Sequence, residues 1–148
     1  MKIYIDGACA VHTTKNGAWA FVVVEDEYLI HEDSGFERNT TNSRMEMTAL
    51  IKALAAYQEY PHPIEVVTDS RLLFNAKEYL SKWNANGWRT SAGEEVLNKD
   101  LWLEIDYLLD CLDVDLQWTK GHSGQKWNEY VDSLCKIVAE QTTISELF

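Results

Sequence analysis

Residues 1–10 read MKIYIDGACA, and this stretch defines the first element of the fold. Apolar and polar side chains alternate along it, with Ile3 and Ile5 on one face and Tyr4 and Asp6 on the other, as expected of a β-strand. An Asp that directly follows a buried apolar run loses solvation free energy and requires a compensating partner. The first predicted strand therefore ends in a carboxylate that needs such a partner.

The rest of the chain alternates between strand and helix patterns. Two more strands with short connections, at residues 17–26 and 27–35, predict an antiparallel meander. Further strands are expected at residues 64–69 and 113–118, and helices at residues 43–60, 70–83, 101–112 and 126–141. This order, βββαβααβα, predicts a single α/β domain over residues 1–148, with a mixed sheet whose later strands follow right-handed crossovers.

The composition is that of a globular protein. Hydrophobic residues make up 46% of the chain, which includes six Trp and seven Tyr, and this excludes a disordered chain. No apolar run approaches the roughly 18 residues that span a bilayer, and MKIYIDGA lacks the apolar region of a signal peptide. The cysteines (Cys9, Cys111 and Cys135) form no CxxC pair, which argues against a disulfide framework and a structural zinc site. We expect a cytoplasmic monomer without membrane contact.

The net charge of −11 argues against a nucleic-acid substrate, because binding to phosphate backbones depends mainly on Lys and Arg. The charge is uneven, however. Residues 100 to 115 contain no Lys or Arg and six acidic residues: Asp100, Glu104, Asp106, Asp110, Asp113 and Asp115. More than half of the excess negative charge lies in this segment, so the composition leaves a nucleic-acid substrate open.

Four carboxylates from distant parts of the chain are expected to meet. Asp6 ends the first strand and Asp69 ends a later one, and ligands gather at the carboxyl ends of parallel strands. Glu46 is expected in the first turn of the helix at 43–60, and Asp132 on the last helix. Carboxylate oxygens without His or Cys favour Mg²⁺ or Mn²⁺ over zinc.

Two interpretations of this cluster remain open from the residues alone. Clustered like charges repel each other, and a divalent ion relieves the repulsion. Two such ions about 4 Å apart can activate a water and stabilise the leaving oxygen of a phosphoryl displacement, which favours a metal-dependent phosphodiesterase. The other interpretation is an α/β domain whose acidic side chains are merely solvated.

Five motifs follow one another along nearly the whole chain: YIDGAC (4–9), TTNSRMEMTAL (40–50), VVTDS (66–70), WNANGW (83–88) with DLW (100–102), and KGHSGQKWNEYVD (120–132). In these motifs and their order the chain resembles type 1 ribonuclease H, the family that cuts RNA in RNA–DNA hybrids. The resemblance implies a ribonuclease H-like fold with the sheet order 3-2-1-4-5. It also implies a sequence-nonspecific endoribonuclease that leaves 5′-phosphate and 3′-hydroxyl ends.

The resemblance also assigns roles to the site residues. It makes Asp6, Glu46, Asp69 and Asp132 the ligands of two Mg²⁺ ions, with Mn²⁺ as the alternative metal and Asp6 bridging both ions. One ion would activate the attacking water, and the other would stabilise the departing 3′-oxygen. His122, in a glycine-flanked loop, becomes the mobile histidine that assists proton transfer or product release.

Substrate contacts are implied in the same way. The positions that match contacts toward the RNA and the active site are Cys9, Asn42, Ser70 and Arg71. Thr41 would lie near a DNA phosphate, Trp83 would stack against sugars of the DNA strand, and Asn128 would face the site from the last helix. Three of these residues also have structural interpretations: Cys9 as a small buried apolar residue, Asn42 as a helix cap and Trp83 as a core anchor.

The sequence departs from the family in two places. The chain after the first strand reads AVHTTKNG (10–17), with His12 near a position that is often a substrate-contacting Asn. The handle, the segment that protrudes after the helix at 70–83, is usually basic in bacterial members. Its cations here are only Lys82, Arg89 and Lys99, offset by Glu94 and Glu95.

Other activities and partners share parts of this pattern. A non-catalytic hybrid-binding module is one alternative, but such a module would need no carboxylates and would bind more tightly with a basic handle. A DNA-acting nuclease or strand-transfer enzyme on the same fold is another, and the position of Glu46 on its helix and the GHSG loop favour ribonuclease H over it. Met1 lies only five residues before Asp6, so no N-terminal hybrid-binding module is expected. The tail TTISELF (142–148) either binds a replication protein through Leu147 and Phe148 or packs back on the last helix.

We predict weak hybrid binding with retained chemistry, because few Lys and Arg are present to neutralise phosphates and release counterions. A plot of the logarithm of the hybrid affinity against the logarithm of salt concentration should have a shallow slope. A slope as steep as that of a protein with many phosphate contacts would contradict the prediction.

Overall fold

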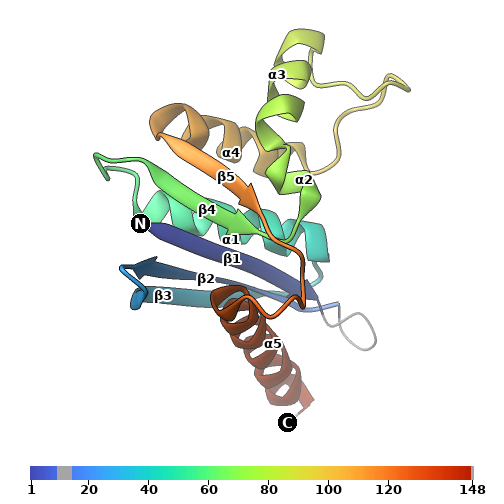
Figure 1. Ribbon diagram of the computed structural model, residues 1–148. Coiled ribbons are helices and arrows are strands. Elements are labelled where there is room, and N and C mark those ends of the chain that lie inside the picture. The colour runs from blue at the N-terminus through green and yellow to red at the C-terminus, as the bar shows by residue number, and fades with distance from the viewer. Residues whose placement is uncertain (10–14, 148) are drawn as a thin grey trace.

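The computed structural model describes residues 1–9 and 15–147, with side chains described up to residue 141. Its five-stranded sheet has the order β3-β2-β1-β4-β5, which confirms the predicted order (Figure 1). The strands are β1 (Lys2–Cys9), β2 (Gly17–Glu25), β3 (Tyr28–Glu37), β4 (Ile64–Thr68) and β5 (Val114–Trp118). The first three form the antiparallel meander, and β4 and β5 continue the sheet parallel to β1.

Helices cover both faces of the sheet. They are α1 (Asn42–Ala56), α2 (Arg71–Phe74), α3 (Ala76–Asn86), α4 (Lys99–Cys111) and α5 (Lys126–Leu147). Ile3 and Ile5 belong to the larger core cluster, which α1 and α4 cover, whereas Tyr4 belongs to the cluster under α5. The alternation read from β1 is therefore confirmed, and both faces of this central strand are buried. None of the described helices is long and apolar enough to cross a membrane.

The predicted helix at 70–83 is divided in two. Ser70 caps the short α2 through its side chain, which accepts a hydrogen bond from the backbone N of Leu73 at 3.2 Å. The chain then bends at Asn75 (φ −93°, ψ 14°) before α3 begins, and Asn is a residue type that favours helix ends over helix interiors. The element order is therefore βββαβαααβα, with one helix more than predicted.

Gly7 allows α1 to approach β1 at close range. A Cβ atom at this position would lie 2.3 Å from the backbone N of Glu46 and 2.4 Å from the backbone C of Met45. Both neighbours are backbone atoms of α1, so they cannot move aside as a flexible side chain would. The absence of a side chain at Gly7 thus places the Glu46 backbone next to the strand that carries Asp6.

Replacing Gly7 by Ala should lower the free energy of unfolding by about 3 kcal/mol or more, because overpacking against fixed backbone forces the helix away from the strand. Urea unfolding would measure the change. Gly87→Ala is the matched control: a Cβ atom at Gly87 would meet nothing within 4 Å, and only its φ of +78° disfavours a side chain, so this change should cost about 1–2 kcal/mol. Equal effects of the two substitutions would contradict the proposed close contact.

Candidate active site

Three of the four predicted carboxylates meet where β1, β4 and α1 come together. Asp6 lies on β1 and is only 6% exposed, and Asp69 directly follows β4. The parallel pairing of the two strands brings both side chains to one edge of the sheet. Glu46 comes from α1, and one oxygen of each of the three carboxylates lies within 4.8 Å of the other two. The predicted convergence is confirmed for these residues.

The start of α1 differs from the prediction in two details. The N-cap is Thr41, whose Oγ1 accepts a hydrogen bond from the backbone N of Arg44 at 3.2 Å, so the alternative interpretation of Asn42 as the cap is wrong. Because α1 begins at Asn42, Glu46 lies in its second turn and not in the first. Thr41 is the residue whose hydroxyl can satisfy the unpaired N–H groups of the first turn.

Arg44 ties the start of α1 to α4. Its guanidinium donates two hydrogen bonds to the carboxylate of Asp100, at 3.0 and 2.9 Å, and a third to the side chain of Asn98 at 3.1 Å. The pair lowers the pKa of Asp100 and raises that of Arg44, chiefly through the hydrogen bonds. The helix that carries Glu46 is thereby oriented from its first turn.

Asp132 approaches the same place from α5. Its carboxyl group is hydrogen-bonded to that of Asp6, and its Oδ2 lies 3.1 Å from Nζ of Lys136 and 4.0 Å from Nδ1 of His122. Among the described residues, Asp132 groups with His122 and Glu129 as a possible set of metal ligands. The four carboxylates therefore form two adjacent groups that are joined through Asp6 and Asp132.

Burial and like charge make this site hold protons. Burial, the hydrogen bond that protonated Asp6 donates to Asp132, and the negative charge of Asp69 together raise the pKa of Asp6 to about 8. Burial also raises the pKa of Glu46 to about 7, although a hydrogen bond with Ser70 acts in the opposite direction. The pKa of Asp69 is raised by burial and by the charge of Asp132.

These features fit a hard divalent cation. The three oxygen ligands are those that Mg²⁺ and Mn²⁺ prefer, and a cation would replace the protons and relieve the repulsion between the carboxylates. Asp6, Glu46 and Asp69 could hold one ion, and Asp132 stands beside them to complete a second position.

The loop before α5 brings His122 toward the carboxylates. A Cβ atom at Gly121 would lie 3.1 Å from Oδ2 of Asp69, so glycine allows the loop to pass close to that carboxylate. His122 itself has a left-handed backbone (φ +55°) and a side chain that is 73% exposed. The backbone N of Gly124 donates a hydrogen bond to Oε1 of Glu129 at 3.2 Å, which fixes the loop to α5.

Comparison with known proteins decides the family. The family model described as RNase H matches residues 1–140 of the chain. A Ribonuclease H of Francisella philomiragia is 43% identical over 141 residues, covering 94% of this chain and 91% of the relative. The chain belongs to the ribonuclease H family.

Solved structures support the fold. A foamy viral protease–reverse transcriptase in complex with RNA/DNA hybrid matches 93% of this chain and 20% of its own, with a TM-score of 0.83 and 18% identity. LC9-RNase H1, a type 1 RNase H with the type 2 active-site motif, matches 95% of this chain and 72% of its own, with a TM-score of 0.79 and 22% identity. The ribonuclease H fold expected from the motifs is thus confirmed.

Ser70 and Arg71, expected to contact substrate in the ribonuclease H family, lie beside the carboxylates. The Ser70 side chain hydrogen-bonds Glu46, and the guanidinium carbon of Arg71 lies 4.1 Å from the centre of the Trp118 ring. Nε1 of Trp118 in turn donates to the backbone O of Asp69 at 3.1 Å. Trp118 thus links Arg71 to the site, and no sequence motif indicated it.

Other predicted contact residues have mixed surroundings. Thr41 and Asn42 are exposed at the start of α1, whereas Cys9 is partly buried with its Sγ 3.5 Å from the backbone O of Thr40. Asn128 is only 3% exposed, and its backbone N donates to Gln125 at 2.6 Å. Their substrate contacts stay predictions.

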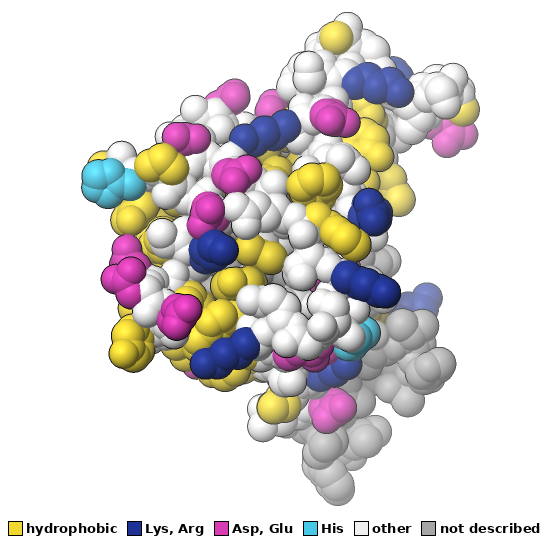
Figure 2. Space-filling model, viewed as in Figure 1, with side chains coloured by type: hydrophobic (Ala, Val, Ile, Leu, Met, Phe, Trp, Pro, Cys, Tyr) yellow, Lys and Arg dark blue, Asp and Glu magenta, His cyan; other side chains and the backbone are white. Residues whose placement is uncertain are grey.

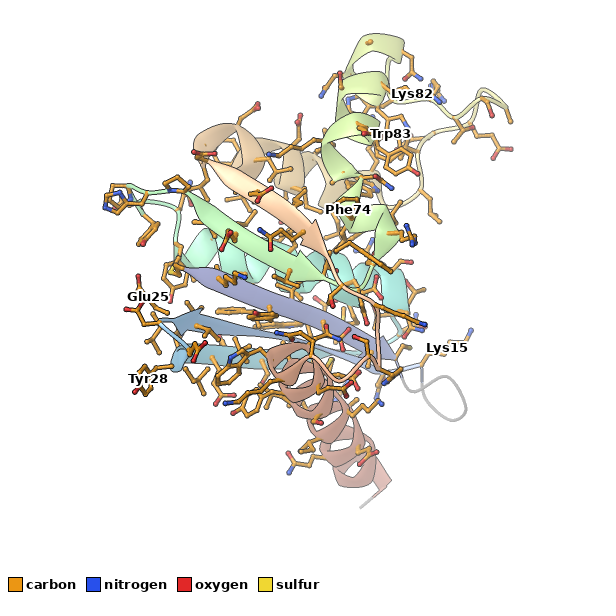
Figure 3. The ribbon with its side chains drawn as sticks, in the orientation of Figure 1. Lys15, Glu25, Tyr28, Phe74, Lys82 and Trp83 are labelled. Carbon is orange, nitrogen blue, oxygen red and sulfur yellow. The ribbon has the colours of Figure 1, made fainter. Side chains whose placement is uncertain are left out.

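Trp83 lies on the protruding α3, next to Lys82, and Figure 3 shows it between the labelled side chains of Lys82 and Phe74. Its ring centre is 5.1 Å from that of Trp102 and 5.4 Å from that of Tyr79, and it packs against the larger core cluster while remaining partly exposed. The core-anchor interpretation is therefore confirmed, and its exposed part leaves the predicted stacking on DNA sugars available.

Two residues near the carboxylates were missed from the sequence. Glu129 lies three positions before Asp132 on α5, and Lys136 lies four positions after it. This helical spacing could have indicated both residues. Two predictions fall outside the described residues: the contact of His12, and the packing of the Leu147 and Phe148 side chains.

In metal-free buffer, Asp6→Asn should stabilise the protein at alkaline pH. The raised pKa of Asp6 means that the folded state favours the protonated acid, so its stabilising contribution is lost as pH rises through about 8. Asn stays neutral and keeps an oxygen for the Gly7 backbone N, which donates to Asp6 at 2.9 Å. Above pH 8 the variant should exceed the wild type by at least about 1.4 kcal/mol, the equivalent of one pKa unit.

Urea unfolding in EDTA between pH 4 and pH 9 would measure this difference, which should vanish at the acidic end. Added Mg²⁺ should reverse the order, because the wild type binds the ion more tightly than the variant. A variant that is less stable than the wild type at pH 9 without metal would show that Asp6 carries no repulsive charge.

Proposed function

We propose that the protein is a metal-dependent endoribonuclease that hydrolyses the RNA strand of RNA–DNA hybrids without sequence preference, leaving 5′-phosphate and 3′-hydroxyl ends. The observation that carries the proposal is the convergence of Asp6, Glu46 and Asp69 within 4.8 Å in a chain of the ribonuclease H family. The relative from Francisella, which is named Ribonuclease H, supports the reaction class. The monomeric state and the cytoplasmic location expected from the sequence stay predictions.

The carboxylates would act as metal ligands. Asp6, Glu46 and Asp69 would hold one Mg²⁺ or Mn²⁺ ion, and Asp6 with Asp132 a second, as the contact between the Asp6 and Asp132 side chains suggests. Bound ions would supply the positive charge that activates a water and offsets the charge developing on the leaving oxygen. The role of the protein is then to hold four acidic groups at a spacing that they would not adopt alone.

His122 is the residue suited to proton transfer. Its imidazole can donate or accept a proton, the side chain is exposed, and its Nδ1 lies 4.0 Å from Oδ2 of Asp132. In the proposed reaction it would approach the departing 3′-oxygen from outside the carboxylate cluster. Its left-handed backbone and the hydrogen bond from Gly124 to Glu129 define the resting position of the loop.

The distribution of charge favours a polyanionic substrate at this edge. Figure 2 shows several Lys and Arg side chains on the right of the view, whereas acidic and basic side chains are interspersed on the left. Arg71 and Lys120 are exposed on the two segments that flank Asp69 and His122. Together with Trp83 and the exposed Thr41 and Asn42, these side chains would contact the backbone of a hybrid.

Asp69→Asn should abolish cleavage while leaving the fold intact. Asn is nearly isosteric with Asp but supplies no negative charge to a cation, so turnover should fall by at least about 100-fold. Cleavage of a labelled RNA–DNA hybrid with Mg²⁺ would measure this, beside single-stranded RNA, duplex RNA and duplex DNA. Asp115→Asn, an exposed Asp on β5, is the matched control and should cut at the wild-type rate.

Each outcome of this experiment is informative. Hybrid binding without cutting by the wild type would favour a non-catalytic hybrid-binding module, and cutting of duplex DNA would favour a DNA-acting nuclease on the same fold. Near-normal activity of Asp69→Asn would show that the carboxylate site is assigned wrongly.

A further inference from the structure

Strand β3 forms one edge of the sheet. In the part of the chain that the structure describes, it pairs with β2 alone, over ten residues from Tyr28 to Glu37. Its register shifts at Ile30, because Leu29 pairs with Val24 and His31 with Val23. The remaining seven residues, from 31 to 37, run in regular register and leave their outer row of N–H and C=O groups without a strand partner.

This edge carries exposed apolar side chains. Tyr28 is 75% exposed, Ile30 51% and Phe36 45%. Figure 3 shows Tyr28 pointing away from the sheet at the start of β3, where it pairs with Glu25. An exposed apolar edge strand is a template for another strand, and large exposed apolar groups that lie together mark interaction surfaces.

The same segment is strongly acidic. Residues 25–37 contain no Lys or Arg, and their six carboxylates are all exposed: Glu25, Asp26, Glu27, Glu32, Asp33 and Glu37. A second copy of this edge would bring the same six charges opposite the first set, and like charges across paired strands are destabilising. The charge therefore disfavours self-association and selects a strand of opposite sign.

We propose that β3 is a docking site for an extended segment of a partner protein in which Lys or Arg alternates with apolar residues. Such a segment would add a strand to the sheet, with main-chain hydrogen bonds to residues 31–37. Its apolar side chains would cover Phe36 and Ile30, and its cations would pair with the carboxylates of β3 and of the turn at residues 25–27.

The position of β3 suggests that a docked partner would affect hybrid binding, and this step of the inference rests on the proposed nuclease function. Gly17 pairs with both Cys9 and Glu37, so the carboxyl end of β3 lies at the same end of the sheet as the end of β1. Cations of the docked segment near Glu37 would extend the positive surface beside the site. The partner would supply phosphate contacts that the weakly basic handle lacks.

The docking itself can be tested without any substrate. The probe is a labelled decapeptide of alternating Lys and Val. It is compared with a version in which every backbone amide is N-methylated, which keeps the side-chain charge but leaves no N–H donor on either strand edge. Fluorescence anisotropy should show binding of the first peptide and at least about tenfold weaker binding of the second. Amide shifts of ¹⁵N-labelled protein should be confined to β3 and its turn.

Charge reversal provides matched variants. Asp33→Lys/Glu37→Lys should weaken binding at least tenfold, whereas Glu104→Lys/Asp110→Lys on α4 changes the net charge equally and should weaken it less than threefold. Thermal unfolding would verify that both variants are folded. Neither pair lies in the carboxylate site, so both variants should retain turnover of saturating hybrid without peptide.

Three results would overturn the proposal, and a fourth would contradict only its link to the nuclease. Equal binding of the two peptides, or equal losses in the two variants, would show that only net charge is being sensed. Sedimentation of the protein alone as a dimer that the β3 variant abolishes would make a second copy the occupant. If the peptide docks on β3 but the complex binds the hybrid no more tightly than the protein alone, the docking site stands and its effect on the nuclease is contradicted.

Discussion

The structure depends on holding three carboxylates closer together than their charges favour. Asp6, Glu46 and Asp69 come from a strand, a helix and the end of a second strand, and each is buried or partly buried. Desolvation and mutual repulsion both oppose this arrangement in the ionised state. The raised pKa values of Asp6 and Glu46 express that cost, and the surrounding packing must offset it.

That packing is rigid where it touches the site. Gly7 brings the α1 backbone against β1 without an intervening side chain, and the residues of α1 that face the sheet are fully buried. The Arg44–Asp100 pair acts differently. With 65% of the Asp100 side chain exposed, such a pair contributes little to the free energy of folding, so its two parallel hydrogen bonds matter mainly for the orientation of α1.

Sequence patterns were sufficient where a residue's environment is set by its own element. The alternation in β1 predicted both faces of the strand, and the position of Asp69 after a short buried strand predicted its place at the sheet edge. The break at Asn75, the link from Trp118 to Asp69 and the pair between Arg44 and Asp100 were not predictable in this way. The two contacts depend on tertiary packing, and the second joins residues that are 56 positions apart. Asn75 is of a type that favours helix ends without requiring one.

An acidic protein can act on a polyanion if its charges are separated. The turn at Glu25–Glu27 lies at the far end of the nine-residue β2 from Gly17, roughly 25 Å at about 3.3 Å per residue. The Debye length at physiological salt is only about 8 Å. A hybrid at the carboxylate edge therefore experiences Arg71 and Lys120 far more than it experiences that turn, and the net charge of −11 is a poor guide to the local potential that governs binding.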